Sequence, residues 1–179
     1  PGRPSPFPSD GALHGARGFF RPMMLTITVA SLLAGGCGIP VKHVSPQRAS
    51  QGYVIILPGI EGAGWWNANI ANGLVDGGVP SQIEVYDWTL TGAMFLANLR
   101  FQWRNEQQAD KIARKIVAYQ DQYPGRPVHL IGHSGGGGIA IMAIERLPAD
   151  RQIASALLLA PAIAPGYDLR KAMRHTQYG

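Results

Sequence analysis

Ser134 is the residue whose sequence surroundings best suit covalent chemistry. Residues 132–136 read Gly-His-Ser-Gly-Gly, and they lie between an apolar run and a helix-like pattern. This order is typical of a nucleophile elbow, a sharp strand-to-helix turn whose flanking glycines leave room for the tight backbone. A serine hydroxyl is a weak nucleophile unless the fold holds it beside a base and beside N–H groups that receive an oxyanion. The pattern therefore predicts that Ser134 is a nucleophile.

A glycine-rich loop follows the first predicted strand, where residues 57–64 read Leu-Pro-Gly-Ile-Glu-Gly-Ala-Gly. Such a loop supplies one oxyanion donor, and the residue after the nucleophile supplies the other. On this interpretation the oxyanion is bound by the N–H group of Gly135 and by that of either Gly59 or Ile60. The alternative is a Pro-Gly turn that only reverses the chain.

Strand and helix signals alternate from residue 51 onward. Aliphatic and β-branched runs predict four strands, at 53–57, 83–86, 128–131 and 154–159. Helical spacing predicts three helices, at 67–75, 105–120 and 137–147. Repeated strand–helix–strand units imply an α/β fold, a parallel sheet with helices on both faces. Ligand sites in such sheets lie beyond the carboxyl ends of the strands, and both glycine-rich loops fall at that edge.

Two local features of this pattern carry further expectations. Asn105 and Gln108 are placed as a variant of the capping box at the start of the second helix. Three tryptophans near the predicted sheet edge either line an acyl pocket or belong to the core: Trp65, Trp66 and Trp88.

The length and composition favour one folded domain. The chain has 179 residues, of which 46% are hydrophobic and only 15% are charged, so disorder is excluded for most of it. We expect the domain to cover residues 51–179 and a proline-containing tether to cover 38–50. Residues 1–22 are aperiodic and start without Met, which indicates a segment outside the domain or a misplaced start.

The charge distribution excludes a nucleic-acid partner. Residues 1–37 contribute +2 of the net charge of +5, which leaves +3 for residues 38–179. Lys111, Arg114 and Lys115 fall on the polar face of a predicted helix, with no basic run and no interleaved aromatic residues. A solvated helix face explains them.

Residues 23–37 have the parts of a secretory signal: arginines upstream, an apolar stretch at 23–34 and small residues before Cys37. A helix needs about twenty residues to span a bilayer, so this stretch is too short to do so. The cysteine after small residues resembles a bacterial lipobox, although Ala34 stands where that pattern prefers leucine. We expect an exported cell-envelope protein, anchored in the membrane by lipid on Cys37. An ordinary cleaved signal and a buried structural cysteine are the alternatives.

Together, these motifs resemble the amino-terminal half of an α/β-hydrolase. Residues 132–136 match the Gly-His-Ser-x-Gly elbow of that family, and 57–60 stand where the family has its His-Gly oxyanion loop, with Pro58 replacing the histidine. The similarity covers residues 51–165. It implies a serine hydrolase that acts on a small-molecule ester, thioester or related acyl bond without a cofactor or metal.

The resemblance also implies a catalytic triad in the order Ser, Asp or Glu, His. His133 is adjacent to the nucleophile and should point away from it, and His129 is expected in the core of a strand. Asp168 is a candidate acid, against a turn or cap role, and His175 is a weak candidate base. We therefore expect that the chain is truncated and lacks its base. We also expect that its sheet ends at the strand that follows the elbow helix.

Three classes of function follow from these patterns. The first is an exported serine hydrolase with Ser134 as nucleophile. The second is a non-catalytic envelope protein that keeps the α/β-hydrolase fold for binding or interaction. Nucleotide binding at residue 134 is disfavoured, because the spacing is not Gly-x-Gly-x-x-Gly and no lysine follows the glycines.

Overall fold

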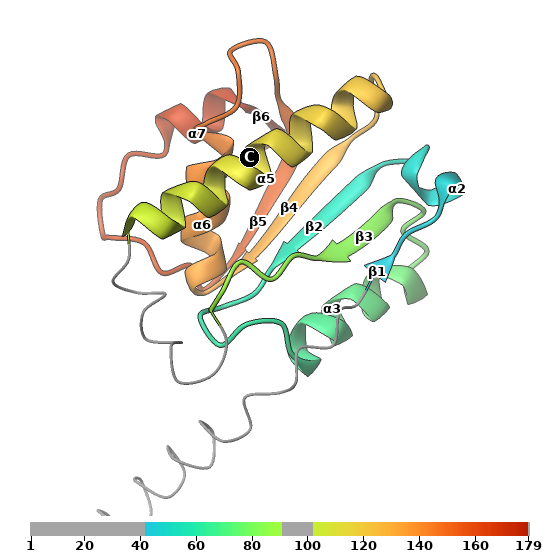
Figure 1. The fold of residues 1–179 in the computed structure, drawn as a ribbon, viewed down its shortest axis with the longest axis horizontal. Coiled ribbons are helices and arrows are strands. Elements are labelled where there is room, and N and C mark those ends of the chain that lie inside the picture. The colour runs from blue at the N-terminus through green and yellow to red at the C-terminus, as the bar shows by residue number, and fades with distance from the viewer. Residues whose placement is uncertain (1–41, 91–101, 179) are drawn as a thin grey trace, which may run out of the picture. The chain divides into compact units, whose positions relative to one another are not determined.

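The computed structural model describes residues 42–90 and 102–178, and in this part of the chain six strands form one sheet (Figure 1). The strands are β1 (Lys42–His43), β2 (Tyr53–Leu57), β3 (Gln82–Val85), β4 (Val128–His133), β5 (Ile153–Leu159) and β6 (Thr176–Tyr178). The helices are α2 (Pro46–Ala49), α3 (Trp65–Asp76), α5 (Gln102–Gln122), α6 (Gly135–Ile144) and α7 (Arg170–Arg174). The strand order is β1-β3-β2-β4-β5-β6.

All strand pairs are parallel except β1 with β3, which is antiparallel. Strand β2 lies between β3 and β4 and is buried at all five positions. Burial on both sides explains why its sequence is a continuous apolar run, since both faces of a parallel sheet are covered by helices. The carboxyl ends of β2 and β4 consequently lie side by side, with Leu57 paired to Gly132.

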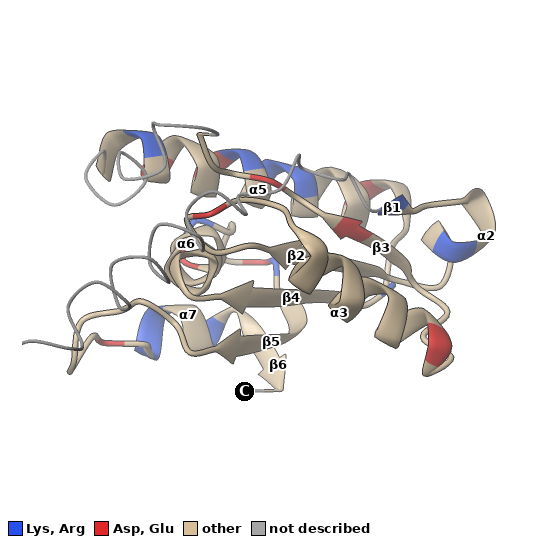
Figure 2. Ribbon diagram, turned by 90° about the horizontal axis from the view of Figure 1, so that it is seen from below, with Lys and Arg blue, Asp and Glu red and all other residues tan. Residues whose placement is uncertain are grey.

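Two hydrophobic layers cover the opposite faces of the sheet. Alternate residues of β2 divide between them, with Ile55 on one side and Ile56 on the other. The larger layer contains side chains from α5, α6 and α7, and the smaller one contains side chains from α3. Helices α5 and α3 therefore lie on opposite sides of the sheet (Figure 2). This arrangement confirms the predicted sheet of mostly parallel strands with helices on both faces.

The predicted strands and helices are all present, with ends that shift by a few residues. The largest differences are at helix ends, because α5 is already helical at Gln102, before its predicted start, and α6 ends at Ile144, before its predicted end. Asn105 therefore lies inside α5, and the prediction that it caps this helix was wrong.

The sheet extends beyond the predicted strands at both edges. Strand β6 follows α7 and pairs with β5, so the prediction that the sheet stops after β5 was wrong. At the other edge, β1 and α2 lie in the segment predicted as a tether at 38–50. Ser45 accepts a hydrogen bond from the Arg48 amide and caps α2, whose first position is proline. Strands of two and three residues are too short to show a hydrophobic period.

The predicted signal segment, Cys37 and residues 1–22 lie outside the described residues. None of the helices in the described ranges is long and apolar enough to cross a membrane.

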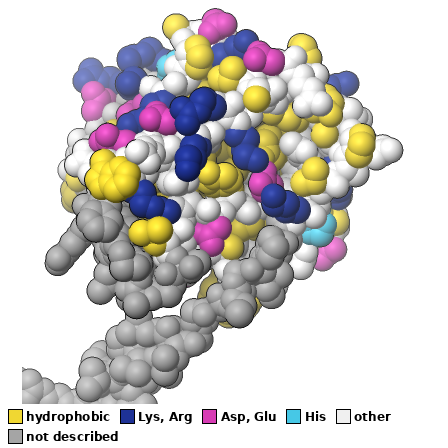
Figure 3. Space-filling model, in the orientation of Figure 1, with side chains coloured by type: hydrophobic (Ala, Val, Ile, Leu, Met, Phe, Trp, Pro, Cys, Tyr) yellow, Lys and Arg dark blue, Asp and Glu magenta, His cyan; other side chains and the backbone are white. Residues whose placement is uncertain are grey.

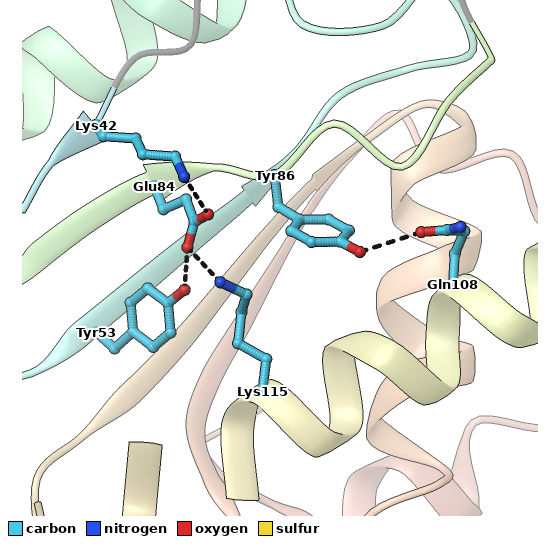
Figure 4. Close-up of polar contacts among 6 residues, drawn as sticks. All are labelled: Lys42, Tyr53, Glu84, Tyr86, Gln108 and Lys115. Carbon is cyan, nitrogen blue, oxygen red and sulfur yellow. Dashed lines mark hydrogen bonds and ion pairs between the residues drawn. The ribbon is translucent and has the colours of Figure 1, made fainter. Parts of the chain in front are cut away.

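A buried carboxylate joins β1, β2, β3 and α5 (Figure 4). Glu84 of β3 is only 7% exposed, and it accepts hydrogen bonds from the Tyr53 hydroxyl and from the Lys115 ammonium at 2.8 Å. Lys42 of β1 completes the cluster at 3.2 Å. Lys115 also lies 5.7 Å from the centroid of the Tyr86 ring, within the range of a cation–π contact. Lys115 is therefore part of a buried network and not of a solvated helix face.

The pKa values of this cluster agree with its hydrogen bonds. Burial and the bond to Glu84 raise the pKa of Tyr53, so its phenol stays protonated and donates. Burial alone raises the pKa of Glu84, but the hydrogen bonds from Lys115 and Tyr53 outweigh it and hold that pKa below its ordinary value.

On the face of the molecule shown in Figure 3, Lys and Arg side chains are interspersed with acidic and hydrophobic ones.

Glu84→Gln is expected to lower the free energy of unfolding by about 1–3 kcal/mol at pH 7, because Lys115 loses a charged partner in a half-buried position. The folded-state pKa of Glu84 is lowered, so its stabilisation is present above the unfolded-state value and is lost as pH falls through the folded one. Urea unfolding of both proteins should therefore show a difference in stability at pH 7 that narrows as the pH falls through the lowered folded-state pKa of Glu84. A difference that stays constant as the pH falls would contradict the role of the charge. Lys42→Gln, at the more exposed end of the cluster, should cost less than about 1 kcal/mol.

Candidate active site

Ser134 lies in a strained turn between β4 and α6. Its φ of 49° and ψ of −118° lie in a region that favours glycine, and only one other described non-glycine residue, Ala160, has a positive φ. The turn is held on both sides, because the Ser134 amide donates to the Leu159 carbonyl at 2.9 Å and the Ser134 carbonyl accepts from the Ala162 amide at 2.8 Å. The end of β5 and the segment after it thus fix the turn at the carboxyl edge of the sheet, where Ser134 is half-buried.

The glycines around Ser134 are required by close backbone contacts. A Cβ on Gly132 would lie 2.7 Å from the carbonyl oxygen of Gly136, and a Cβ on Gly136 would lie 2.7 Å from the carbonyl carbon of Leu57. Real Cβ atoms do not approach backbone atoms so closely. Helix α6 can therefore press its first turn onto the end of β2 only because these positions have no side chain.

The glycine-rich loop after β2 lies against the residue that follows Ser134. A Cβ on Gly135 would lie 2.9 Å from Cγ2 of Ile60 and 3.6 Å from the Ile60 amide nitrogen. The amide of Gly135 is in the first turn of α6, where N–H groups have no partner within the helix. Of the two loop donors expected from the sequence, Ile60 is the one whose nitrogen lies beside Gly135. Gly59 instead lies under the Glu61 side chain, whose carboxyl carbon is 2.8 Å from the position of a Gly59 Cβ.

The side chains of Glu61 and His133 lie next to each other beside this loop. The distance between Nδ1 of His133 and Oε1 of Glu61 is 3.6 Å, and both side chains are partly exposed. His133 thus contacts the loop through the side chain of Glu61. The carboxylate of Glu61, which follows Ile60 in the sequence, therefore lies close to the proposed oxyanion donor.

Residues 87–89, which follow β3 after Tyr86, hold the same loop, and sequence reasoning missed this role. The Asp87 carboxylate accepts a hydrogen bond from the Ala63 amide at 3.1 Å, and the Trp88 indole donates to the Pro58 carbonyl at 2.7 Å. Trp88 is 1% exposed and belongs to the core, as one of the two interpretations had it. Trp65 and Trp66 are 56% and 62% exposed and stack on each other, so they are not core residues.

The remaining described histidines are placed away from the nucleophile. His129 lies within β4, where Nδ1 is 2.8 Å from the Ser155 hydroxyl and burial lowers the pKa of the ring. His175 lies at the amino end of β5, because its carbonyl accepts from the Ile153 amide and its Nδ1 is 2.9 Å from the Arg151 carbonyl. Since β5 has seven residues, about 20 Å of strand separate that edge from the edge of Ser134. Among the described histidines, none hydrogen-bonds to Ser134.

Asp168 is exposed and bound to Arg170. Its two carboxylate oxygens accept from the guanidinium at 2.6–3.0 Å, and these bonds hold the pKa of Asp168 below its ordinary value. Asp168 also accepts from the Arg170 amide two residues further on, which is an Asx turn and therefore the turn role that the sequence left open. Within residues 42–90 and 102–178, no three His, Cys, Asp or Glu side chains gather into a metal-binding group.

A mostly parallel sheet with a strained serine turn at its carboxyl edge is the architecture of an α/β-hydrolase. Residues 48–178 match the family described as serine aminopeptidase, S33, and the chain belongs to that family. It is therefore a hydrolase of α/β-hydrolase type. Comparison of the sequence with curated proteins gives no significant match.

Proposed function

We propose that the protein is a serine hydrolase that cleaves an ester or a related acyl bond, with Ser134 as its nucleophile. The observation that carries this proposal is the backbone of Ser134, whose φ of 49° and ψ of −118° hold a non-glycine residue in a strained turn. Strain of this kind persists where the surrounding structure imposes it, and it is concentrated at functional sites. The Ile60 amide beside Gly135 supports the same function, because an acyl-transfer site needs paired N–H donors near the nucleophile.

The proposed reaction has two steps. The Ser134 oxygen attacks the acyl carbon and gives its proton to a general base, while the amides of Gly135 and Ile60 stabilise the negative oxygen. The tetrahedral intermediate collapses, and the leaving alcohol takes the proton from the base. Water then attacks the acyl-enzyme by the same route and releases the acid. Each oxyanion donor contributes about 3 kcal/mol to the stability of the transition state.

The general base in this proposal is a histidine outside the described residues. The described histidines are His43, His129, His133 and His175. Each of them contacts a partner other than Ser134: Asn72, Ser155, Glu61 and the Arg151 carbonyl. Without the base, the oxyanion donors and substrate binding would leave about a thousandfold acceleration over water.

A second candidate reaction is removal of an amino-terminal residue from a peptide, which is the activity in the family description. The position of Glu61 favours this peptide reaction. This carboxylate, one residue from the Ile60 donor and 48% exposed, can attract the α-ammonium group of a peptide. Both reactions use the same nucleophile and the same donors, and they differ in the substrate alone.

A fluorophosphonate probe tests the nucleophile directly. The full-length protein is expected to form a covalent adduct in the tryptic peptide 116–146, in which Ser134 is the only serine. Ser134→Ala should abolish the adduct. Ser155→Ala is the matched control, because Ser155 is the serine that hydrogen-bonds to a histidine elsewhere in the sheet, and this variant should label like the wild type.

Absence of the adduct from folded wild-type protein would reject the serine hydrolase and favour the non-catalytic binding protein. Where the adduct forms, p-nitrophenyl acyl esters and aminoacyl p-nitroanilides separate the two candidate reactions. Faster turnover of the anilides, reduced by Glu61→Gln, would assign the peptide reaction.

A further inference from the structure

The segment after β3 contacts both ends of the loop that carries the Ile60 donor. Trp88 bonds to Pro58 at the start of the loop, and Asp87 bonds to Ala63 near its end. Both contacts join residues that are far apart in the sequence, with separations of 30 and 24 positions. Ile60 lies between the two attachment points, so its amide can move little while both are intact.

Trp88 sets the distance between the loop and the elbow. Its indole Nε1 donates to the Pro58 carbonyl at 2.7 Å, and Cζ2 of the same ring lies 3.3 Å from the position of a Gly135 Cβ. The ring is 1% exposed and packs in the core between these two contacts. One rigid side chain therefore spans the two segments that provide the oxyanion donors.

Asp87 fixes the other end of the loop. Its Oδ1 accepts from the amide and the hydroxyl of Thr89 at 2.9 and 2.6 Å, which orients the carboxylate so that Oδ2 can accept from the Ala63 amide. Gly62 has a φ of 87°, and a Cβ there would lie 2.9 Å from the Thr89 hydroxyl and 3.1 Å from Oδ2 of Asp87. The loop thus folds directly onto the Asp87–Thr89 turn.

We propose that Trp88 and Asp87 are positioning residues for the oxyanion hole. They hold the Ile60 amide beside the Gly135 amide, so that both can donate to the same oxygen. This inference rests on the proposed function. Stabilisation of a developing charge depends on donors that are fixed before the reaction begins. A displacement of about 1 Å in such a group can reduce the rate by about a hundredfold.

The variants Trp88→Phe and Asp87→Asn test this role in the full-length protein. Phenylalanine keeps an apolar ring and removes the indole N–H, and asparagine keeps the shape and weakens one acceptor. Each variant should reduce kcat of ester hydrolysis by about 10- to 100-fold, with KM within about twofold of the wild type. Hydrogen exchange of the Gly62 and Ala63 amides should become at least tenfold faster. Rates are measured well below the midpoint of thermal unfolding, so that lost folding does not contribute.

Two matched controls separate positioning from general effects. Trp103→Phe changes an indole that is 60% exposed on α5, and Asp121→Asn changes a carboxylate that bonds to Arg151. Both should leave kcat and the exchange of the loop unchanged. Wild-type kcat and unchanged loop exchange in Trp88→Phe and Asp87→Asn would overturn the inference. A wild type that does not react with the phosphonate would reject the proposed function, and loop exchange would then decide alone whether these residues fix the loop.

Discussion

Ser134→Gly is expected to give a protein that is more stable than the wild type and unable to hydrolyse its substrate. The φ of 49° and ψ of −118° at Ser134 cost an L-residue about 1–3 kcal/mol, and glycine adopts them without strain. Glycine also has more conformational freedom in the unfolded chain, which offsets about 0.5–1 kcal/mol of this gain. The net increase in the free energy of unfolding should be about 1 kcal/mol. Loss of the proposed nucleophile should reduce kcat by about a millionfold.

Ser134→Ala separates strain from chemistry in this experiment. Alanine removes the hydroxyl and keeps the Cβ, so activity should fall equally while the gain in stability is absent. Ala160→Gly is a second control, because Ala160 has a φ of 44° and lies after β5. It should stabilise the fold without the loss of activity. A Ser134→Gly protein that unfolds at lower urea concentration than Ser134→Ala would contradict the argument from strain.

Gly136→Ala is expected to cost more than about 3 kcal/mol of stability. The new Cβ would lie 2.7 Å from the carbonyl carbon of Leu57 and would also press on the carbonyl oxygens of Leu57 and Pro58. These are backbone atoms of β2 and of the loop after it, so no side-chain rotation relieves the overlap. Helix α6 would have to move away from β2, and the Ile60 loop would move with it.

Gly73→Ala is the matched control for that substitution. Gly73 lies within α3, and a Cβ there meets no atom within 4 Å. Alanine should therefore stabilise the protein by about 1 kcal/mol, through helix propensity alone. Urea unfolding of the three proteins gives the comparison. A Gly136→Ala variant within 1 kcal/mol of the wild type would show that the first turn of α6 can shift at little cost.

The central part of the fold could be predicted from the sequence because burial leaves a pattern. Strand β2 is covered on both faces, and its sequence is an unbroken apolar run. Strand β4 leads directly into the glycines of the elbow. The edges left no such pattern. Strands β1 and β6 have two and three residues, and what places them is pairing with β3 and β5. Pairing of this kind is a long-range property that local sequence does not record.

The polar contacts of the candidate site were missed for a similar reason. Asp87 and Thr89 stand two positions apart, which is a turn signal, yet nothing local indicates that Asp87 reaches Ala63. Lys115 likewise occupied an apparently polar position of a helix, and only the sheet beneath it brings Glu84 within 2.8 Å. Side chains that act across the fold become visible once strand order is known.

The four glycines that open α6 have a consequence for the order of folding. Residues 135–138 are all glycine, and each costs a helix about 1 kcal/mol relative to alanine. A first turn of this composition does not form by itself, because helix nucleation is already unfavourable. It becomes stable when β2 and the segment after β5 are in place to contact it, since Gly136 meets Leu57 and Gly137 meets Pro161. The serine turn is therefore completed late, and a nascent or partly unfolded chain does not yet hold Ser134 in the conformation that the proposed reaction needs.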